Sequence, residues 1–154
     1  MRVYVKSILD CSPELVWDEV QTSALLVEVA WPLVRLVPTD PPELPRRWDR
    51  GRPVRLRSYL FGFIPLGTRT VAFDRIDAER REIETREHDP LIRRWDHTMR
   101  VWPIGGRTLY SDDIEIEAGI LTLPVVLFAH WFYRHRQRRW RTVVQRLAAN
   151  QPSA

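Results

Sequence analysis

The sequence predicts an α+β fold in which a curved antiparallel sheet of about six or seven strands wraps around one long C-terminal helix. The last stretch, Leu123 to Ala149, contains no glycine, and its one proline, Pro124, lies at the second position, where a helix tolerates it. Before this stretch come short β-like segments separated by turn signals, and two short helices follow the first of them. A helix of this length needs a sheet to lie on, and a sheet wrapped around it satisfies the order of elements.

One stripe of residues recurs at helical spacing along the C-terminal stretch. Its members are Val126, Ala129, Tyr133, Arg136, Trp140, Val144 and Leu147. At 1.5 Å per residue the helix would run roughly 40 Å, which is long enough to cross a small domain. We therefore expect this stripe to cover the sheet.

The N-terminal segment predicts a strand and then two short helices. Val3 to Leu9 alternates β-branched and polar residues, which is typical of a half-buried strand. Ser12, Pro13 and Glu14 supply an N-cap, a proline at the first helical position and an acid facing the helix dipole. The buried face of that helix is expected to carry Val16, Trp17, Val20 and Ala24, and Thr22 and Ser23 are expected to cap a second helix from Ala24 to Ala30.

The middle of the chain predicts a meander of strands. After a brief strand over Leu33 to Val37 comes a proline-rich loop, Pro38 to Pro45. The β-like segments that follow cover 53–61, 68–77, 81–87, 91–101 and 108–117, with turn signals at 62–67, 77–79, 88–90 and 105–106. Connections this short favour antiparallel neighbours.

Length and composition indicate one globular domain. With 154 residues we expect a single domain over residues 1–150 and a disordered tail over 151–154. The lone cysteine, Cys11, cannot form an internal disulfide, and the first residues lack the apolar run of a signal peptide. The most apolar segment, Ala118 to Tyr133, is short for a membrane span. These features favour a cytoplasmic protein without stable membrane insertion.

The net charge of +4 comes almost entirely from arginine, since Lys6 is the only lysine. Six arginines lie between Arg134 and Arg146. Such a cluster either binds phosphates or anionic lipid, or forms the solvated face of an amphipathic helix. The second interpretation is favoured, and no nucleic-acid partner is expected.

Several short motifs, among them Cys11 to Trp17, Leu60 to Leu66 and Ile92 to His97, occur in a characteristic order along the chain. Together with the order of elements, they resemble the START/Bet v 1/polyketide-cyclase (SRPBCC) superfamily. The opening, Cys11 to Trp17, is similar to the superfamily's strand-then-SPEEVW start. Leu60-Phe61-Gly62-Phe63-Ile64-Pro65-Leu66 is similar to a segment of bacterial ligand-binding SRPBCC proteins of unassigned function, as are residues 92–97, 105–108 and 110–116. The resemblance covers about residues 1 to 149. It implies a helix-grip fold with a hydrophobic pocket between sheet and long helix, but no single reaction.

Strand alternation identifies the side chains expected to face that pocket. The apolar face of 91–101 includes Trp95, His97 and Met99, and Asp112 lies on the matching face of 108–117. His97 and Asp112 are thus the polar residues most expected in an apolar space. Either they act as a general base and its orienting carboxylate, or they satisfy each other or Tyr110 as a buried polar group.

The complete set of expected ligand-binding residues is drawn from the strands and the long helix. It comprises Leu56, Ser58, Leu60, Phe73, Trp95, His97, Met99, Tyr110, Asp112, Ile114, Phe128, Trp131 and Phe132. Among the seven tryptophans, Trp31, Trp95, Trp102, Trp131 and Trp140 fall near expected edges of the cavity and would suit a planar guest. No histidine pair has metal-ligand spacing, so neither a metal nor a cofactor is expected.

Three functions follow from these features. The leading hypothesis is a non-catalytic binder of a hydrophobic small molecule such as a lipid, isoprenoid or polyketide-like compound. The second is a cyclase- or dehydratase-type enzyme in which His97 is the base and Asp112 orients it. The third is a peripheral interaction protein that uses the arginine-rich helix end. The expected assembly is a monomer or a homodimer.

Overall fold

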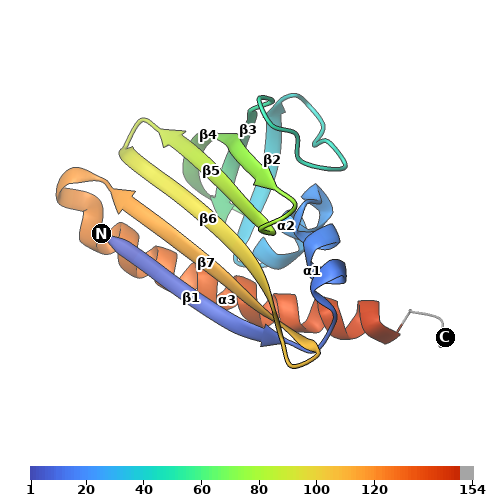
Figure 1. Cartoon of the computed structure of the whole chain (residues 1–154). Helices are drawn as coiled ribbons and strands as arrows, with labels where there is room; N and C mark the ends of the chain where they lie inside the picture. Colours follow the sequence, from blue (N-terminus) through green and yellow to red (C-terminus); the bar gives the residue numbers. More distant parts are fainter. Residues whose placement is uncertain (150–154) are drawn as a thin grey trace.

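A seven-stranded antiparallel sheet curves along one side of a long C-terminal helix in the computed structural model, which describes residues 1–149 (Figure 1). The strands are β1 (Arg2–Leu9), β2 (Val34–Asp40), β3 (Val54–Leu60), β4 (Ile64–Asp77), β5 (Glu82–Asp89), β6 (Ile92–Ile104) and β7 (Arg107–Glu117). The helices are α1 (Pro13–Val20), α2 (Ser23–Ala30), the 3₁₀ turn η1 (Gly119–Leu121) and α3 (Thr122–Ala149). The predicted fold class is confirmed. The tail predicted over 151–154 lies outside the described residues.

The sheet order is β1-β7-β6-β5-β4-β3-β2, so each strand from β2 to β7 pairs with its neighbour in sequence and β1 closes the far edge against β7. Short turns between consecutive strands produce this meander. Several strands extend beyond their predicted bounds, including β2, β4, β5 and β6. β2 continues past Pro38 to Asp40, which is possible because it is an edge strand and needs no amide donor on its free side.

β4 begins at Ile64, so the prediction of a turn over 62–67 was wrong in its second half. Residues 64–67 pair with β3, and the register shifts between Ser58 and Tyr59 opposite them. The turn itself is shorter, with Phe61 and Gly62 both at positive φ. A register shift of this kind breaks the alternation of a strand and so hides it from pattern reading.

The two short helices begin where their caps predict. The Ser12 hydroxyl accepts a hydrogen bond from the Leu15 amide at 3.3 Å, and the Thr22 hydroxyl accepts one from the Leu25 amide at 3.2 Å. α1 ends at Val20, so Ala24 belongs to α2 and is exposed rather than on the buried face of α1. Leu25 takes the buried position instead.

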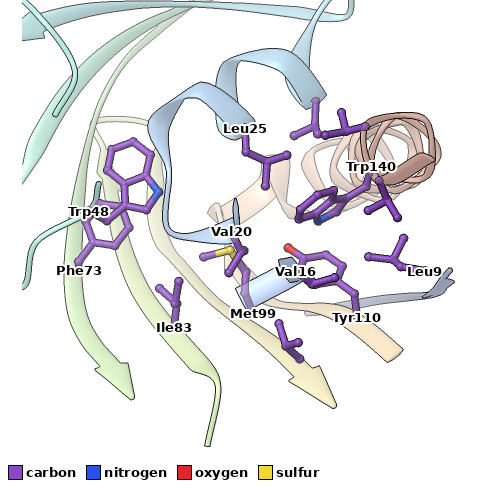
Figure 2. Packing of buried hydrophobic residues seen from close by; sticks show 14 of the residues in the cluster. Leu9, Val16, Val20, Leu25, Trp48, Phe73, Ile83, Met99, Tyr110 and Trp140 are labelled. Carbon is purple, nitrogen blue, oxygen red and sulfur yellow. The ribbon is translucent and has the colours of Figure 1, made fainter. Parts of the chain in front are cut away.

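α3 lies behind the sheet along β1 and β7, and α2 packs against its middle (Figure 1). Its buried residues are Ala129, Tyr133, Arg136, Gln137, Trp140, Val143 and Val144, which confirms the predicted stripe at all of its central positions. The buried residues at the C-terminal end of α3 belong to the main hydrophobic cluster of the core (Figure 2). There the Trp140 ring meets Tyr110 edge-on at 5.9 Å, and across the core Trp48 stacks on Phe73 at 4.7 Å.

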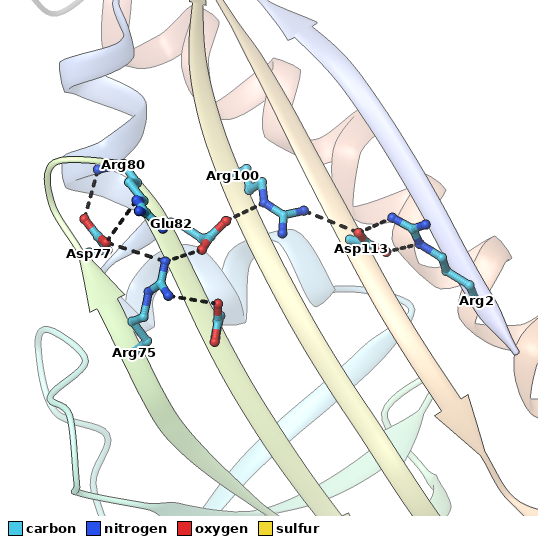
Figure 3. Close-up of polar contacts among 8 residues, drawn as sticks. Arg2, Arg75, Asp77, Arg80, Glu82, Arg100 and Asp113 are labelled. Atoms are coloured by element: carbon cyan, nitrogen blue, oxygen red, sulfur yellow. Dashed lines mark hydrogen bonds and ion pairs between the residues drawn. The ribbon is translucent and has the colours of Figure 1, made fainter.

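The outer face of the sheet carries a ladder of alternating charges (Figure 3). Arg75 on β4, Glu82 on β5, Arg100 on β6, Asp113 on β7 and Arg2 on β1 join in sequence across five strands. Alternation along each strand therefore directs the neighbouring residues, such as Met99 and Asp112, into the core.

Candidate functional site

A cavity of about 90 Å³ lies between the inner face of the sheet and the middle of α3. Its walls are mostly apolar and come from β2 to β6, from α1, α2 and α3, and from the loop that carries Trp48. The lining residues are Val20, Leu25, Leu26, Val34, Leu36, Trp48, Leu56, Ser58, Leu66, Arg69, Val71, Phe73, Thr85, Glu87, Trp95, His97, Met99, Phe128, Phe132, Tyr133 and Arg136.

A larger depression of about 690 Å³ lies on the outer face of the sheet, where Arg55, Arg57 and His88 border it. These side chains are exposed and the depression is open to solvent. The inner cavity is the better candidate site, because buried polar residues such as His97 and Arg136 line it and its apolar walls can desolvate an apolar ligand.

The polar centre beside the cavity is Asp112, which is fully buried on β7. Its Oδ1 atom accepts hydrogen bonds from His97 Nε2 and from the Tyr110 hydroxyl, both at 2.9 Å. Its Oδ2 atom accepts one from Gln137 Nε2 at 2.9 Å, and Gln137 in turn accepts from the Ser7 hydroxyl at 2.6 Å. This network ties β1, β6, β7 and α3 together around one carboxylate.

The network keeps Asp112 ionised. Burial alone would raise the pKa of Asp112, but the hydrogen bonds from His97 and Gln137 and the charge of Arg136 outweigh burial and hold that pKa below its usual range. Burial next to this carboxylate raises the pKa of Tyr110 well above normal, so the phenol stays protonated and donates. Asp112 is thus an acceptor with its hydrogen bonds already made.

His97 lines the cavity, and both of its ring nitrogens have partners. Because Asp112 is ionised, Nε2 carries the proton and donates to it. Nδ1 then accepts from the Tyr133 hydroxyl over a long 3.4 Å, and that hydroxyl accepts from Trp95 Nε1, also at 3.4 Å. Tyr133 therefore stands next to the nitrogen that a substrate would have to reach.

Two arginines also line the cavity, and they differ in their partners. Arg69 makes an ion pair with Glu87 at 2.8 Å and lies over the Trp95 ring at 4.7 Å. Arg136, on the buried face of α3, lies over the rings of Tyr133 at 5.0 Å and Phe132 at 5.8 Å. Its Nε atom is buried without a hydrogen-bond partner, and the same is true of the Thr85 hydroxyl on β5.

Eight of the predicted binding residues line the cavity. They are Leu56, Ser58, Phe73, Trp95, His97, Met99, Phe128 and Phe132. Tyr110, Asp112 and Ile114 are fully buried behind the wall, where Tyr110 and Asp112 support His97 and Ile114 packs with Val3 and Trp95. Leu60 packs in a separate small cluster with Leu33 and Val34. Trp131 is 49% exposed and contacts Phe61 and Phe128 from outside.

Most of the expected tryptophans do not reach the cavity. Trp31 and Trp102 are exposed and Trp140 fills the solid core, which leaves Trp95. Sequence reading missed Trp48, because it lies in a loop without periodicity. A bond from its amide to the Gln21 carbonyl at 2.9 Å holds it against the core. The signal for Arg136 was available, since its helical phase places it between Tyr133 and Trp140 on the buried stripe.

Three further features of residues 1–149 concern metal ligands, the cysteine and membrane spans. No three histidine, cysteine, aspartate or glutamate side chains gather there as metal ligands. Burial raises the pKa of Cys11 to about 11, so its thiol stays protonated near neutral pH. No helix in this range is both long and apolar enough to cross a membrane.

One known protein-family model matches most of the chain. The model of a domain of unknown function, DUF8410, matches residues 7–144. The chain belongs to the DUF8410 family. No curated protein matches the sequence of this DUF8410 chain significantly.

Solved structures similar to this DUF8410 chain show its fold. A START superfamily protein from Mycobacterium smegmatis is 16% identical, with a TM-score of 0.68, and the match covers 95% of this chain and 98% of that one. The major latex-like protein 151 of Panax ginseng is 12% identical, with a TM-score of 0.66 and coverage of 92% and 95%. A Chromobacterium violaceum protein is 11% identical, with a TM-score of 0.74 and coverage of 93% and 96%. The predicted SRPBCC-type helix-grip fold is therefore confirmed.

Proposed function

We propose that this protein binds a small, largely apolar molecule in the cavity between the sheet and α3. The observation that carries the proposal is the contrast within the core: apolar walls surround an unfilled space into which buried polar side chains project at only a few points. That combination is typical of ligand sites, where apolar area supplies affinity and a few polar groups fix orientation.

The size of the cavity favours a compact ligand. Pockets for drug-sized molecules occupy about 300–1,000 Å³, whereas this one holds about 90 Å³. A short chain or a small ring system therefore fits better than a long lipid. Phe128 and Phe132, which are only partly buried, are the side chains best placed to move for a larger isoprenoid or polyketide-like guest.

Probe binding tests the proposal. Calorimetry and thermal melting with naphthalene-based and octane-based probes should show saturable binding and a rise in melting temperature, because a ligand that binds only the folded state stabilises it. Ser58→Phe should fill the cavity and reduce affinity at least tenfold, since Ser58 is buried and lines it. Arg57→Phe, on the opposite face of the same strand, is the matched control and should bind normally.

Two results would count against a binding site. The proposed binding site would be rejected if neither probe class bound the wild type at millimolar concentration. Equal loss of affinity in Ser58→Phe and Arg57→Phe would place the probe elsewhere.

A second candidate is an enzyme that uses His97 as general base, and the 2.9 Å pair with Asp112 at the cavity wall favours it. A buried carboxylate that orients the imidazole is what such a base requires. The binder is preferred because both nitrogens of His97 already have partners, so a substrate would have to displace Tyr133 or react through its hydroxyl.

Proton exchange distinguishes the two functions without knowledge of the substrate. A bound cyclic ketone in D₂O would gain deuterium next to its carbonyl if His97 removes protons, and His97→Gln would slow this about a hundredfold or more. A pure binder gives only the buffer rate in both proteins. We expect the buffer rate, together with retained ketone binding in His97→Gln.

A further inference from the structure

Arg136 is a buried charge whose hydrogen bonds are incomplete. The residue is only 8% exposed, and its Nε atom has no partner. Among residues 1–149 it joins no ion pair within 4 Å, in contrast to Arg69 across the same cavity, which is paired with Glu87. A guanidinium taken out of water without acceptors is strongly destabilising, and folded proteins rarely retain one without a reason.

Among residues 1–149, the nearest negative charges do not supply the missing acceptor. Asp112 is close enough to favour the charged form of Arg136, but its oxygens already accept from His97, Tyr110 and Gln137. Glu87 is bonded to Arg69. The aromatic rings of Phe132 and Tyr133 flank the guanidinium but offer no in-plane acceptor for its N–H groups.

The N–H donors of Arg136 that lack an acceptor belong to a side chain at the cavity wall. It lines the cavity, and the other partnerless polar group of the cavity wall, the Thr85 hydroxyl, lines it from β5. Of the two arginines that line the cavity, Arg69 is paired with Glu87, whereas Arg136 has its counter-charge, Asp112, behind the wall and not within ion-pair distance. A planar guanidinium is matched in geometry and charge by a carboxylate, which it can bind through two parallel hydrogen bonds.

We propose that the ligand is an apolar carboxylic acid, whose carboxylate binds Arg136 while its hydrocarbon part lies against the apolar wall. This inference rests on the proposed binding function and adds to it the chemical class of the ligand. Arg136 anchors the head group, and the walls around Leu56, Phe73 and Met99 receive the body.

Matched probes that differ only in the head group test this inference. Calorimetry at pH 7 compares 2-naphthoate with 2-naphthalenemethanol and with 2-acetylnaphthalene, and octanoate with 1-octanol. The wild type should bind each carboxylate at least tenfold more tightly than its neutral counterparts. Arg136→Met, which keeps a similar length without charge, should lose this preference and bind the alcohols within about threefold of the wild type.

Arg138→Met is the matched control, because Arg138 lies two residues along the same helix and is exposed. It loses the same charge and should keep the preference for carboxylates. If Arg136→Met does not fold, as judged by circular dichroism, the wild-type comparison still decides, and Arg136→Lys supplies a variant that keeps the charge but not the planar fork.

The outcomes separate the inference from the function on which it rests. Binding of none of the probes rejects the proposed binding site itself. Three other outcomes overturn the carboxylate class and leave the binding site in place. These are binding without preference, equal affinity for 2-acetylnaphthalene and 2-naphthoate, and a preference for carboxylates that survives in Arg136→Met.

Discussion

The two halves of the interface between α3 and the sheet are built differently. Toward the C-terminal end of α3, Trp140, Val143 and Val144 belong to one hydrophobic cluster with Tyr110 and Leu9, and none of these five side chains lines the cavity (Figure 2). Near its middle, Phe128, Phe132 and Arg136 face Ser58, Thr85 and Val71 across open space.

The difference lies in side-chain size and polarity. Where two large rings meet, as Trp140 and Tyr110 do, the gap between a helix and a curved sheet is filled. Opposite the middle of α3 the cavity wall includes the small strand residues Ser58, Thr85 and Val71, and the buried polar residues His97 and Arg136 also line it. We therefore expect the first half to contribute more to stability, and the second half is where the proposed ligand would bind.

Trp140→Ala is the largest expected effect, because it empties a filled site. The side chain is 2% exposed, and truncation of such a residue lowers the free energy of unfolding by about 3–5 kcal/mol. Phe128→Ala, in the hollow half, should cost about 1 kcal/mol, since Phe128 is only partly buried and already borders a void. Urea melts of both variants measure the contrast, and equal losses would mean that the two halves do not differ.

Asp112→Asn should have the second-largest effect and lower the free energy of unfolding by about 2–3 kcal/mol. One acceptor oxygen becomes a donor facing Gln137, and the buried charge of Arg136 loses its counter-charge. The neighbouring Asp113→Asn is the control. Asp113 points to the outer face, where Arg2 and Arg100 hold it at a partly hydrated site, so its loss should stay below about 1 kcal/mol (Figure 3).

The pH dependence of Asp112→Asn has a definite sign. The folded-state pKa of Asp112 is lowered, so its contribution is complete above the ordinary carboxyl value of 3.8 and is lost as the pH falls through the lower folded-state value. The difference in unfolding free energy between wild type and Asp112→Asn should therefore shrink from about pH 5 to about pH 2. A constant difference over this range would show that ionisation of Asp112 is not what the network stabilises.

The sequence was sufficient for the architecture but only partly for the site. Helical spacing located the buried face of α3, and alternation turned His97, Met99 and Asp112 inward, because both periods are local properties of the backbone. The sequence did not show which of the inward-facing residues reach the cavity and which lie behind its wall. Tyr110, Asp112 and Ile114 face inward yet lie behind the wall, since the curvature of the sheet and the size of opposing side chains decide what reaches a cavity.

The sequence assigned Arg136 to two sets that predict opposite environments, the buried stripe of α3 and the arginine cluster between Arg134 and Arg146. The run from Arg134 to Arg146 indicated a solvated face, and that holds for exposed members such as Arg134 and Arg138. Arg136 belongs instead to the buried stripe. Helical phase decides between these environments, and the composition of the run does not.

The smallest expected effect is that of Arg134→Gln combined with Arg138→Gln. Both side chains are exposed on the face of α3 away from the sheet, and isolated surface charges change stability by less than about 0.5 kcal/mol. Arg139 and Arg141 are left unchanged, because Arg139 Nε is buried and Arg141 reaches the Ser7 hydroxyl at 3.4 Å. Melting temperature and probe affinity of the double variant should match the wild type.

Sedimentation with anionic vesicles is the third measurement, since Leu127 and Trp131 are exposed one to two turns earlier on the same helix. Vesicle binding by the wild type that disappears in the double variant would favour a role of this helix face in interaction with membranes over a purely solvated one.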